Sequence, residues 1–458
     1  MNRFLSEAEC SALFTKVAGM AVGGGKTEIQ IDSSWSGGMR WAHNQILACG
    51  DVRYNDVAIG RTIRGARNRA QTNQLDDASL EGAIRRAERL LTLRPENVEE
   101  PLEPLSAEPY QTPKLWYDAT FNLDAEARAA AMAALAKPAH EAGMLSAGFI
   151  SVGAAGRAAS ATGIRSLYYP STSAEFTVTV RDPKGTGSGW AGVSGNDWGA
   201  IDTHALAATA LDKCLRSRNP VGLEPGRYVT ILEPQAVCDL VSPLFDGWAM
   251  DRYFTEQRMP PLPFSGDARG TTKIGEPIFD ERITISADPM DPDIAFVPFN
   301  VFTASDKELQ VYHAVKWFED GILMQLAYDR AYALRELGRD QGLPNSGAFK
   351  MSGDTATMED MISSTRRGLL VTRFSDVSVV DRTSLLLSGY TRDGVWLIEN
   401  GKISKPVKNF RFTDSPLFAL GNVEMLGTPK RVYHPNAPVM VPPMKVRDFS
   451  FTGVSDAV

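Results

Sequence analysis

The sequence is poor in the side chains that build metal and redox centres. Its 458 residues include only four cysteines and five histidines. These are Cys10, Cys49, Cys214 and Cys238, and His43, His140, His204, His313 and His434. No cysteine belongs to a Cys-x-x-Cys motif, which argues against a disulfide framework or a zinc knot and predicts reduced, buried thiols. No pair of histidines has the spacing of metal ligands, although His313 and His434 fall in the same half of the chain.

Long apolar runs and an excess of positive charge are also missing. Hydrophobic residues make up 43 % of the chain, charged residues 22 %, and the formal net charge is −7. This balance gives no general attraction for nucleic acid or for an anionic membrane. No apolar run approaches the length of a membrane span, and the first residues lack the apolar core of a secretion signal. We therefore expect a globular cytoplasmic protein that binds neither nucleic acid nor membranes.

The first hundred residues predict a helix, a sheet and a second helix. Residues 6–20 have an amphipathic helical pattern, which ends at three glycines at positions 23–25. The glycines follow a helix and precede a strand, so they predict a loop and not a phosphate cradle. Strands of an antiparallel meander are predicted at 28–32, 39–43 and 52–61. Ser79 is predicted to cap the second helix, and Pro95 to end it.

The next hundred residues predict a second mixture of helix and strand. An alanine-rich segment from Asp124 to about Ala142 predicts a helix. Strands are predicted at 148–152, 166–169 and 175–181, a mobile glycine-rich loop at 185–192, and a final helix at 204–216.

Proline-rich segments suggest how the chain divides. Residues 94–113 hold five prolines among acidic residues, which is typical of an extended connection. Residues 219–226, rich in proline and glycine, form the best boundary between domains. The predicted domains are an N-terminal α+β domain at 1–225, with units at about 1–100 and 114–218, and a C-terminal domain rich in antiparallel strands at 226–458.

The densest run of local signals lies between residues 353 and 412. Asp354 or Thr355 is predicted to cap a short helix, which cationic residues and Gly368 then end. A strand is predicted directly after it, at 369–374.

A hairpin follows in the same stretch. Asn400 and Gly401 separate two strand-like segments, 395–399 and 402–404. This dipeptide favours a type I′ turn because both central residues need positive φ.

The stretches GDTATMEDMISSTRRGLLVTRF and WLIENGKISKPVKNF together resemble the C-terminal domain of the TldD/PmbA family of metallopeptidase-related proteins. The meander followed by NQLDDASLEGAIRRAERL is similar to the first domain of the same family. The resemblance extends from about residue 27 to residue 452 and implies an α+β protein with a β-rich C-terminal domain.

The resemblance fails at the catalytic motif. In the peptidase members, a helix at this place carries His-Glu-x-x-x-His, whose histidines bind zinc and whose glutamate is the general base. Here residues 237–247 read VCDLVSPLFDG and contain no histidine. The family peptidases also use a cysteine ligand near the C-terminus, and residues 436–446 contain no cysteine. The resemblance therefore implies no catalytic, cofactor-binding or metal-binding residue in this chain.

Members without the zinc motif resemble PmbA, also called TldE. This implies a non-catalytic subunit that pairs with a zinc-bearing TldD-like subunit in a heterodimeric peptidase for unfolded peptides, with zinc held by the partner. A self-sufficient hydrolase stays open, because Asp246, Asp251 and Asp267 could bind a hard cation. Ser188 lies between two glycines but lacks the spacing of a nucleophile elbow. A homodimeric peptide-binding module is the other alternative.

Two hairpins could hold such a peptide. The segments 317–326 and 395–406 are predicted to leave free strand edges at a cavity, to which an extended peptide can add as a strand. Pro406 would limit pairing along one edge. The alternative is that both hairpins lie inside their sheets.

Overall fold

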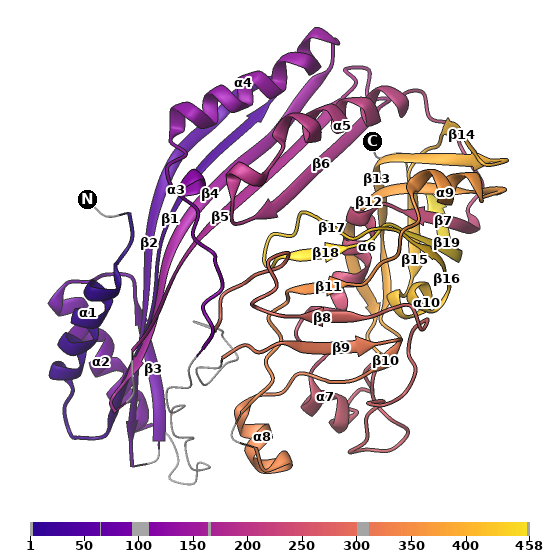
Figure 1. Ribbon diagram of the computed structural model, residues 1–458. Coiled ribbons are helices and arrows are strands. Elements are labelled where there is room, and N and C mark those ends of the chain that lie inside the picture. The colour runs from indigo at the N-terminus through magenta and orange to yellow at the C-terminus, as the bar shows by residue number, and fades with distance from the viewer. Residues whose placement is uncertain are drawn as a thin grey trace.

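The computed structural model describes residues 3–64, 66–93, 110–163, 166–299, 311–339 and 341–455. Figure 1 shows a long, curved sheet from the N-terminal half facing a C-terminal half built from short and long strands. The arrangement is α+β with mostly antiparallel pairing, which confirms the predicted fold class. In the described part of the chain, no helix is long and apolar enough to cross a membrane.

The N-terminal sheet has six antiparallel strands in the order β3-β2-β1-β4-β5-β6. They are β1 (Lys26–Ala42), β2 (Gln45–Ile63), β3 (Ala66–Thr72), β4 (Leu145–Ala161), β5 (Leu167–Arg181) and β6 (Ser188–Gly195). Strands from both predicted N-terminal units thus lie in one sheet, because β1 pairs with β4 along most of its length.

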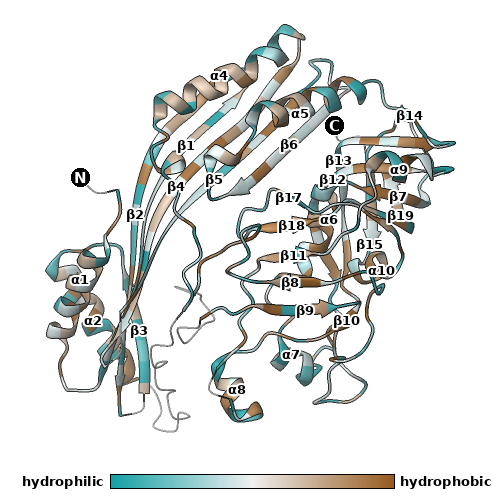
Figure 2. Ribbon diagram, viewed as in Figure 1, coloured by the Kyte–Doolittle hydropathy of each residue, from teal (hydrophilic) through white to brown (hydrophobic). Residues whose placement is uncertain are grey.

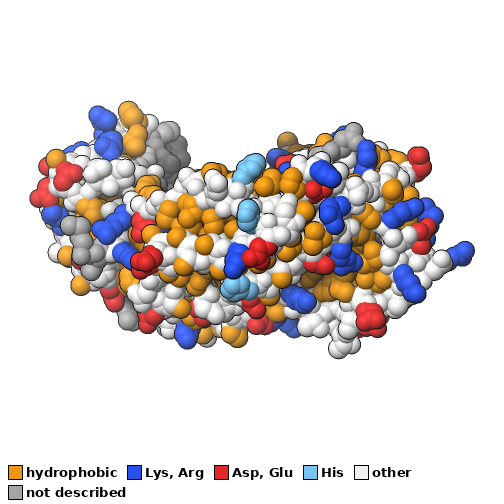
Figure 3. All heavy atoms as spheres, turned by 90° about the horizontal axis from the view of Figure 1, so that it is seen from above, with side chains coloured by type: hydrophobic (Ala, Val, Ile, Leu, Met, Phe, Trp, Pro, Cys, Tyr) orange, Lys and Arg blue, Asp and Glu red, His pale blue; other side chains and the backbone are white. Residues whose placement is uncertain are grey.

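Helices cover one face of this sheet at both ends. They are α1 (Glu7–Met20), α2 (Asp77–Leu91), α3 (Asp118–Phe121), α4 (Ala125–Glu141) and α5 (Thr203–Arg216), with a 3-10 turn at Trp198–Ala200. In Figure 1, α1 and α2 lie at one end of the strands and α4 and α5 at the other. Seen from above, the face around α4 and α5 carries hydrophobic side chains between charged residues of both signs (Figure 3).

The C-terminal half holds two further sheets. One has the order β10-β9-β8-β11-β18-β17, formed by β8 (Ile285–Ala287), β9 (Val315–Glu319), β10 (Ile322–Leu323), β11 (Phe349–Met351), β17 (Lys430–Arg431) and β18 (Val439–Val441). The other contains β7 (Gly226–Leu232), β12 (Arg367–Asp381), β13 (Leu386–Glu399), β14 (Lys402–Pro406), β15 (Phe410–Asp414), β16 (Val423–Leu426) and β19 (Met444–Val454). Because β12 also pairs with β13, this second sheet closes on itself.

The helices of this half are short and lie against these sheets. They are α6 (Pro234–Val241), α7 (Arg252–Gln257), α8 (Arg330–Leu337), α9 (Met358–Ser363) and α10 (Pro416–Gly421), with a 3-10 turn at Ser242–Phe245. Figure 2 shows hydrophobic residues along the strands of the C-terminal half.

The largest hydrophobic core lies in the C-terminal half, where the aromatic side chains of several strands meet. The ring of Phe374 on β12 lies 4.4 Å from that of Phe412 on β15 and 5.6 Å from that of Phe449 on β19. All three side chains are buried. Burying one phenylalanine contributes roughly 1.5–3 kcal/mol, so this triple anchors the closed sheet.

Several local predictions are confirmed. Asn400 and Gly401 have φ of 51° and 76° and join β13 to β14, as a type I′ turn requires. The predicted alanine-rich helix is α4, whose first turn is capped by the Asp124 side chain. The three glycines after α1 all have positive φ and lie outside regular structure.

Two helix caps were predicted at the wrong residues. The cap of α2 is Asp76, which accepts a hydrogen bond from the Ser79 backbone N–H, so Ser79 is helical. The cap of α9 is Thr357, in a reciprocal capping box with Asp360, and not Asp354 or Thr355. Gly368 lies in β12 and does not end the helix, because α9 already ends at Ser363.

Strand lengths in the N-terminal half were also wrong. The predicted strands 28–32 and 39–43 are parts of one 17-residue strand, β1. The predicted strands 166–169 and 175–181 likewise merge into β5, and the predicted loop 185–192 contains the start of β6. Long neighbouring strands continue the ladder through serine and glycine residues that would otherwise favour turns. Pro95 and most of the predicted connection 94–113 lie outside the described residues.

Candidate functional site

Helix α6 lies where the family resemblance places the zinc motif of the peptidases, a motif that this chain lacks. It follows β7, begins with Pro234 at its first turn, and packs mainly on β12. Gln235 and Asp239 lie one turn apart on the same side of this helix. The amide N–H of Gln235 donates to Asp239 Oδ1 at 2.8 Å, and its Oε1 accepts from the backbone N–H of Tyr433 at 3.1 Å.

Asp239 connects this helix to β12. The backbone N–H of Phe374 donates to Asp239 Oδ2 at 2.8 Å. Both carboxylate oxygens of Asp239 therefore accept hydrogen bonds from within the chain. Burial raises the pKa of Asp239 to about 6, partly opposed by Gln235, Arg373 and the Phe374 N–H. The side chains at this place act as a clamp between α6, β12 and the segment before β18.

Cys238 on the same helix belongs to no group of three or more potential metal ligands among the described residues. Its side chain is buried, and burial raises the pKa of its thiol far above the usual range. The sulfur lies 3.4 Å from Ser242 Oγ.

The donor set therefore does not fit the zinc that the resemblance places here in the peptidases. Among the described residues there is no group of three or more His, Cys, Asp or Glu side chains that could hold a metal ion. The three aspartates considered for a hard cation belong to no such group among the described residues. The Asp251 carboxylate caps α7 by accepting from the Phe254 N–H, and Asp246 lies near His434.

The two histidines of the C-terminal half also have separate environments. His313 is exposed, whereas His434 is partly buried and its Nδ1 accepts from the Ala437 N–H at 3.2 Å. Burial lowers the pKa of His434, partly opposed by the nearby Asp246.

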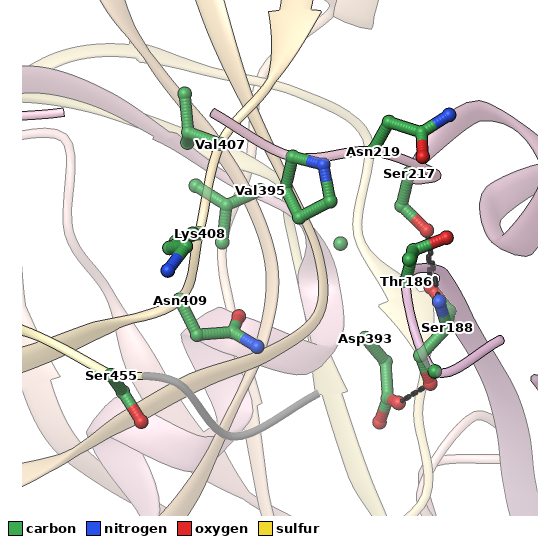
Figure 4. A pocket seen from close by; sticks show the side chains of 13 residues that line it. Thr186, Ser188, Ser217, Asn219, Asp393, Val395, Val407, Lys408, Asn409 and Ser455 are labelled. Atoms are coloured by element: carbon green, nitrogen blue, oxygen red, sulfur yellow. Dashed lines mark hydrogen bonds between the residues drawn. The ribbon is translucent and has the colours of Figure 1, made fainter. Parts of the chain in front are cut away.

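A polar junction next to α6 joins the two halves of the chain. The Ser188 hydroxyl, at the start of β6, donates a hydrogen bond to Asp393 on β13 (Figure 4). Arg373 on β12 lies 3.6 Å from the Asp393 carboxylate and stacks over the Trp190 ring at 4.5 Å. Asp393 has φ of 57° and sits at a break in the β12–β13 register, which turns its side chain toward Ser188.

The junction borders a pocket of about 310 Å³. It is lined by Ser188, Ser217, Asn219, Asp393, Lys408 and Asn409, among others. Ser217 accepts from the Ser188 N–H at 3.0 Å and donates to the Ser188 carbonyl at 2.8 Å. A serine nucleophile needs a general base, usually histidine, placed between it and the carboxylate. In this pocket the carboxylate binds the serine directly, so the geometry is that of a structural contact.

A larger cleft of about 480 Å³ lies between the N-terminal sheet and the C-terminal half. One wall is the inner face of the sheet, which we define by Ser34, Ser36, Gly153, Ala155, Ser171 and Ser173. The opposite wall includes Phe296, Tyr312 and the segment 434–438. The inner face is thus made of small and hydroxyl-bearing side chains, whereas the facing wall is largely aromatic and apolar.

The charged groups of the cleft are one ion pair and one isolated carboxylate. Arg157 pairs with Asp32 at 3.0 Å and donates to Ser171 at 3.2 Å. Glu175 has no ion-pair partner within the described ranges, and burial raises its pKa. Ser194 on β6 connects the two walls of the cleft, because its hydroxyl donates a hydrogen bond to the backbone carbonyl of His434 at 3.0 Å. The arrangement can accept a polar, extended ligand with a cationic group near Glu175.

The two predicted peptide-binding hairpins are not at this cleft. Their strands β10 and β14 do lie at the ends of their sheets, so free edges exist. Neither strand contributes to the walls of the cleft. Pro277 also bridges to Ile322, which partly covers the edge of β10. Both hairpins thus end their sheets and lie away from this cleft, and their placement at a cavity between two subunits stays a prediction.

The model of the PmbA/TldA metallopeptidase C-terminal domain matches residues 225–453, which is half of the chain. The chain belongs to the PmbA/TldD family. No curated protein matches the sequence.

Solved structures of very different sequence share the fold of this PmbA/TldD-family chain. A proposed modulator of a DNA gyrase from Thermotoga maritima has a TM-score of 0.81 at 14% identity, covering 97% of this chain and 99% of that chain. TldE from Thermococcus kodakarensis has a TM-score of 0.79 at 18% identity, covering 97% and 100%. A proposed modulator of DNA gyrase from Bacteroides thetaiotaomicron has a TM-score of 0.79 at 17% identity, covering 98% and 100%. At these identities the likeness establishes the fold alone.

Proposed function

We propose that this chain is a non-catalytic, PmbA/TldE-like subunit of a TldD/TldE-type heterodimeric zinc metallopeptidase in the cytoplasm. The observation that carries the proposal is the clamp formed by Gln235 and Asp239 on α6. At the place of the zinc motif, the polar side chains are engaged in hydrogen bonds to Tyr433 and Phe374. These bonds engage both carboxylate oxygens of Asp239, and residues 237–247 contain no histidine that could hold zinc. The zinc is therefore assigned to a TldD-like partner.

The role of the chain would be to enclose and position an unfolded peptide. Hydrolysis requires the peptide backbone to be extended and accessible. The inner face of the N-terminal sheet offers serine hydroxyls, which can bond a peptide backbone without reading its sequence. The aromatic wall opposite can contact side chains of many kinds. This combination supports a guiding surface for peptides of varied sequence.

A self-sufficient hydrolase is the less favoured function. Its best candidate nucleophile, Ser188, is buried and bonded to Asp393, and no histidine lines that pocket among the described residues. The buried hydroxyl could not reach a peptide in the cleft.

Affinity purification from the native host tests the partnership. The tagged chain is expressed at its natural level, and every protein that copurifies at one-to-one stoichiometry is identified by mass spectrometry. We expect one such partner, of related sequence and carrying His-Glu-x-x-x-His. The zinc in the purified complex should equal the amount of the partner and not the sum of both chains. A zinc-loaded preparation of this chain without a partner would refute the proposal.

A further inference from the structure

One carboxylate on the inner face of the N-terminal sheet has no partner. Glu175 follows Ser173 by two residues on β5, so both side chains point into the cleft of about 480 Å³. Glu175 is half-buried, yet no hydrogen bond or ion pair joins its side chain to any residue that the structure describes. Its oxygens are not among the fully enclosed, unpartnered polar atoms of the described chain. The carboxylate therefore reaches the open space of the cleft.

The cation of the inner face is too far away to neutralise this charge. Arg157 on β4 pairs with Asp32 at 3.0 Å. In the register of β4 and β5, Glu175 lies opposite Ser151, which is six residues from Arg157. At about 3.3 Å per residue, the two side chains start about 20 Å apart along the strand.

The cation on the facing side is also engaged elsewhere. Burial and the nearby Glu175 raise the pKa of Tyr433, partly opposed by Arg373, so both charges lie near this tyrosine. Arg373, however, lies 3.6 Å from the carboxylate of Asp393. A carboxylate that loses part of its hydration without gaining a counter-charge is costly to keep ionised. Within the described chain, nothing replaces the hydration that Glu175 loses in the cleft.

We propose that Glu175 binds a cationic group of the peptide that the cleft guides, either its N-terminal ammonium or a lysine or arginine side chain. This inference rests on the proposed function, since it takes the ligand of the cleft to be a peptide. Ammonium and guanidinium groups donate charge-assisted hydrogen bonds to a carboxylate, which are about twice as strong as neutral ones. Glu175 is then a specificity-determining residue. The serines accept any peptide backbone, and Glu175 selects peptides with a positive charge.

The position of Glu175 sets where the charged part of the peptide lies. Glu175 is opposite Ser194 in the β5–β6 ladder, and Ser194 connects the two walls through the His434 carbonyl. Ser171, which accepts from Arg157, lies four residues from Glu175 on the same strand, or about 13 Å away. An extended peptide of about four residues spans this distance. The cation is thus held where the walls are joined, and the neighbouring peptide residues lie along the serines.

Binding of matched peptides to the full chain tests the charge requirement. The probe is a short, unstructured peptide of glycine, serine and alanine with a dye at its C-terminus. One pair of probes has a free or an acetylated N-terminus. A second, acetylated pair has one central lysine or norleucine. By fluorescence anisotropy, we expect the charged member of at least one pair to bind at least about fivefold more tightly than its neutral counterpart.

The two pairs distinguish the sources of the cation. A preference within the first pair alone assigns the site to the N-terminal ammonium. A preference within the second pair alone assigns it to a cationic side chain, and a preference within both shows that Glu175 accepts either.

Variants of the chain show whether Glu175 carries this preference. E175Q keeps the size of the side chain without its charge and should reduce the preference to less than about twofold. E175D keeps a carboxylate and should retain more of the preference than E175Q. The control E126Q removes the same charge from an exposed site on α4, which covers the other face of the sheet, and should leave the preference unchanged. Urea unfolding checks that all three variants are folded.

The inference and the proposed function can fail separately. A wild-type chain that binds charged and neutral peptides equally, or binds none of them, would overturn the inference. A preference that survives in E175Q would do the same. Peptide cleavage by the zinc-bearing partner, with and without this chain, decides the proposed function independently. If that cleavage depends on the chain while no charge preference is seen, the proposed function stands and this inference is wrong.

Discussion

Replacing Asp239 with asparagine should change how the stability of the protein depends on pH. Burial raises the pKa of this carboxyl from 3.8 to about 6. The neutral form is therefore favoured in the folded state, and its stabilising contribution is complete below pH 3.8 and lost as the pH rises through 6. Between pH 5 and pH 8 the loss is about 1.4 kcal/mol for a single group with these pKa values.

The variant D239N removes this titration. Asparagine keeps the size of the side chain and one acceptor for the Phe374 N–H. The second acceptor, which binds the Gln235 amide, is lost, so we expect a pH-independent cost of about 1 kcal/mol. Urea unfolding at pH 5, 6, 7 and 8 gives the free energy of unfolding of both proteins. The wild-type value minus the D239N value should fall by about 1.4 kcal/mol from pH 5 to pH 8.

The control is D212N, on α5, where 61 % of the aspartate side chain is exposed. Its free energy of unfolding should follow the wild-type pH curve within about 0.5 kcal/mol. If the free energy of unfolding of D239N also runs parallel to the wild-type pH curve, Asp239 does not titrate in this range. The clamp on α6 is then not the buried, acid-stabilised contact described above.

Three further outcomes follow from the structure. Gly401 has φ of 76°, and a Cβ there would lie 2.6 Å from the Ser363 carbonyl oxygen. G401A should therefore lower the free energy of unfolding in urea by about 1–3 kcal/mol. The control G421A, where a Cβ would meet nothing within 4 Å, should lower it by less than about 1 kcal/mol. Arg61 is 1 % exposed and donates to Glu88, Thr27 and three backbone carbonyls, so R61M should lower the free energy of unfolding by about 3 kcal/mol; a change below about 1 kcal/mol would contradict this. The purified chain should contain well under one zinc per chain by elemental analysis and show no chelator-sensitive peptidase activity; one tightly bound zinc with ligands from this chain would refute the account of α6.

Local signals in the sequence predicted the elements that are stabilised locally. The Asn400-Gly401 turn and the helix α4 depend on residues within one or two turns of each other, and both were predicted in the right place. The helix caps at Asp76 and Thr357 were missed by two or three residues because several capping residues occur in a row. Choosing between them needs the packing of the helix, which the local sequence does not contain.

The long strands were not predictable from local pattern. Residues Gly37 and Gly38 resemble a turn, yet they lie in the middle of β1, paired on both sides. Gly37 is needed there because Arg128 from α4 occupies the space that a side chain would fill. Such a requirement comes from a helix about ninety residues away in the sequence, so only the folded structure reveals it.

The candidate site also combines features that the local sequence shows with features that only the folded structure reveals. The sequence shows directly that residues 237–247 contain no histidine. It did not predict that Gln235 and Asp239 form a clamp in that place, nor that Ser188 meets Asp393, 205 residues later. The only local signal for Asp393 is the Asp-Gly pair inside a strand, which is typical of a bulge. The inner face with Glu175 was missed because its serines and glycines carry no sequence motif.

The rate of peptide cleavage by the zinc-bearing partner, measured with and without this chain, tests the central claim most directly. The substrate is an unstructured peptide, and the chain is titrated from zero to twofold excess over a fixed amount of the partner. We expect the rate to rise with added chain and to reach a plateau at one chain per partner, with no cleavage by the chain alone. Equal rates with and without the chain, or cleavage by the chain in the absence of the partner, would contradict the claim.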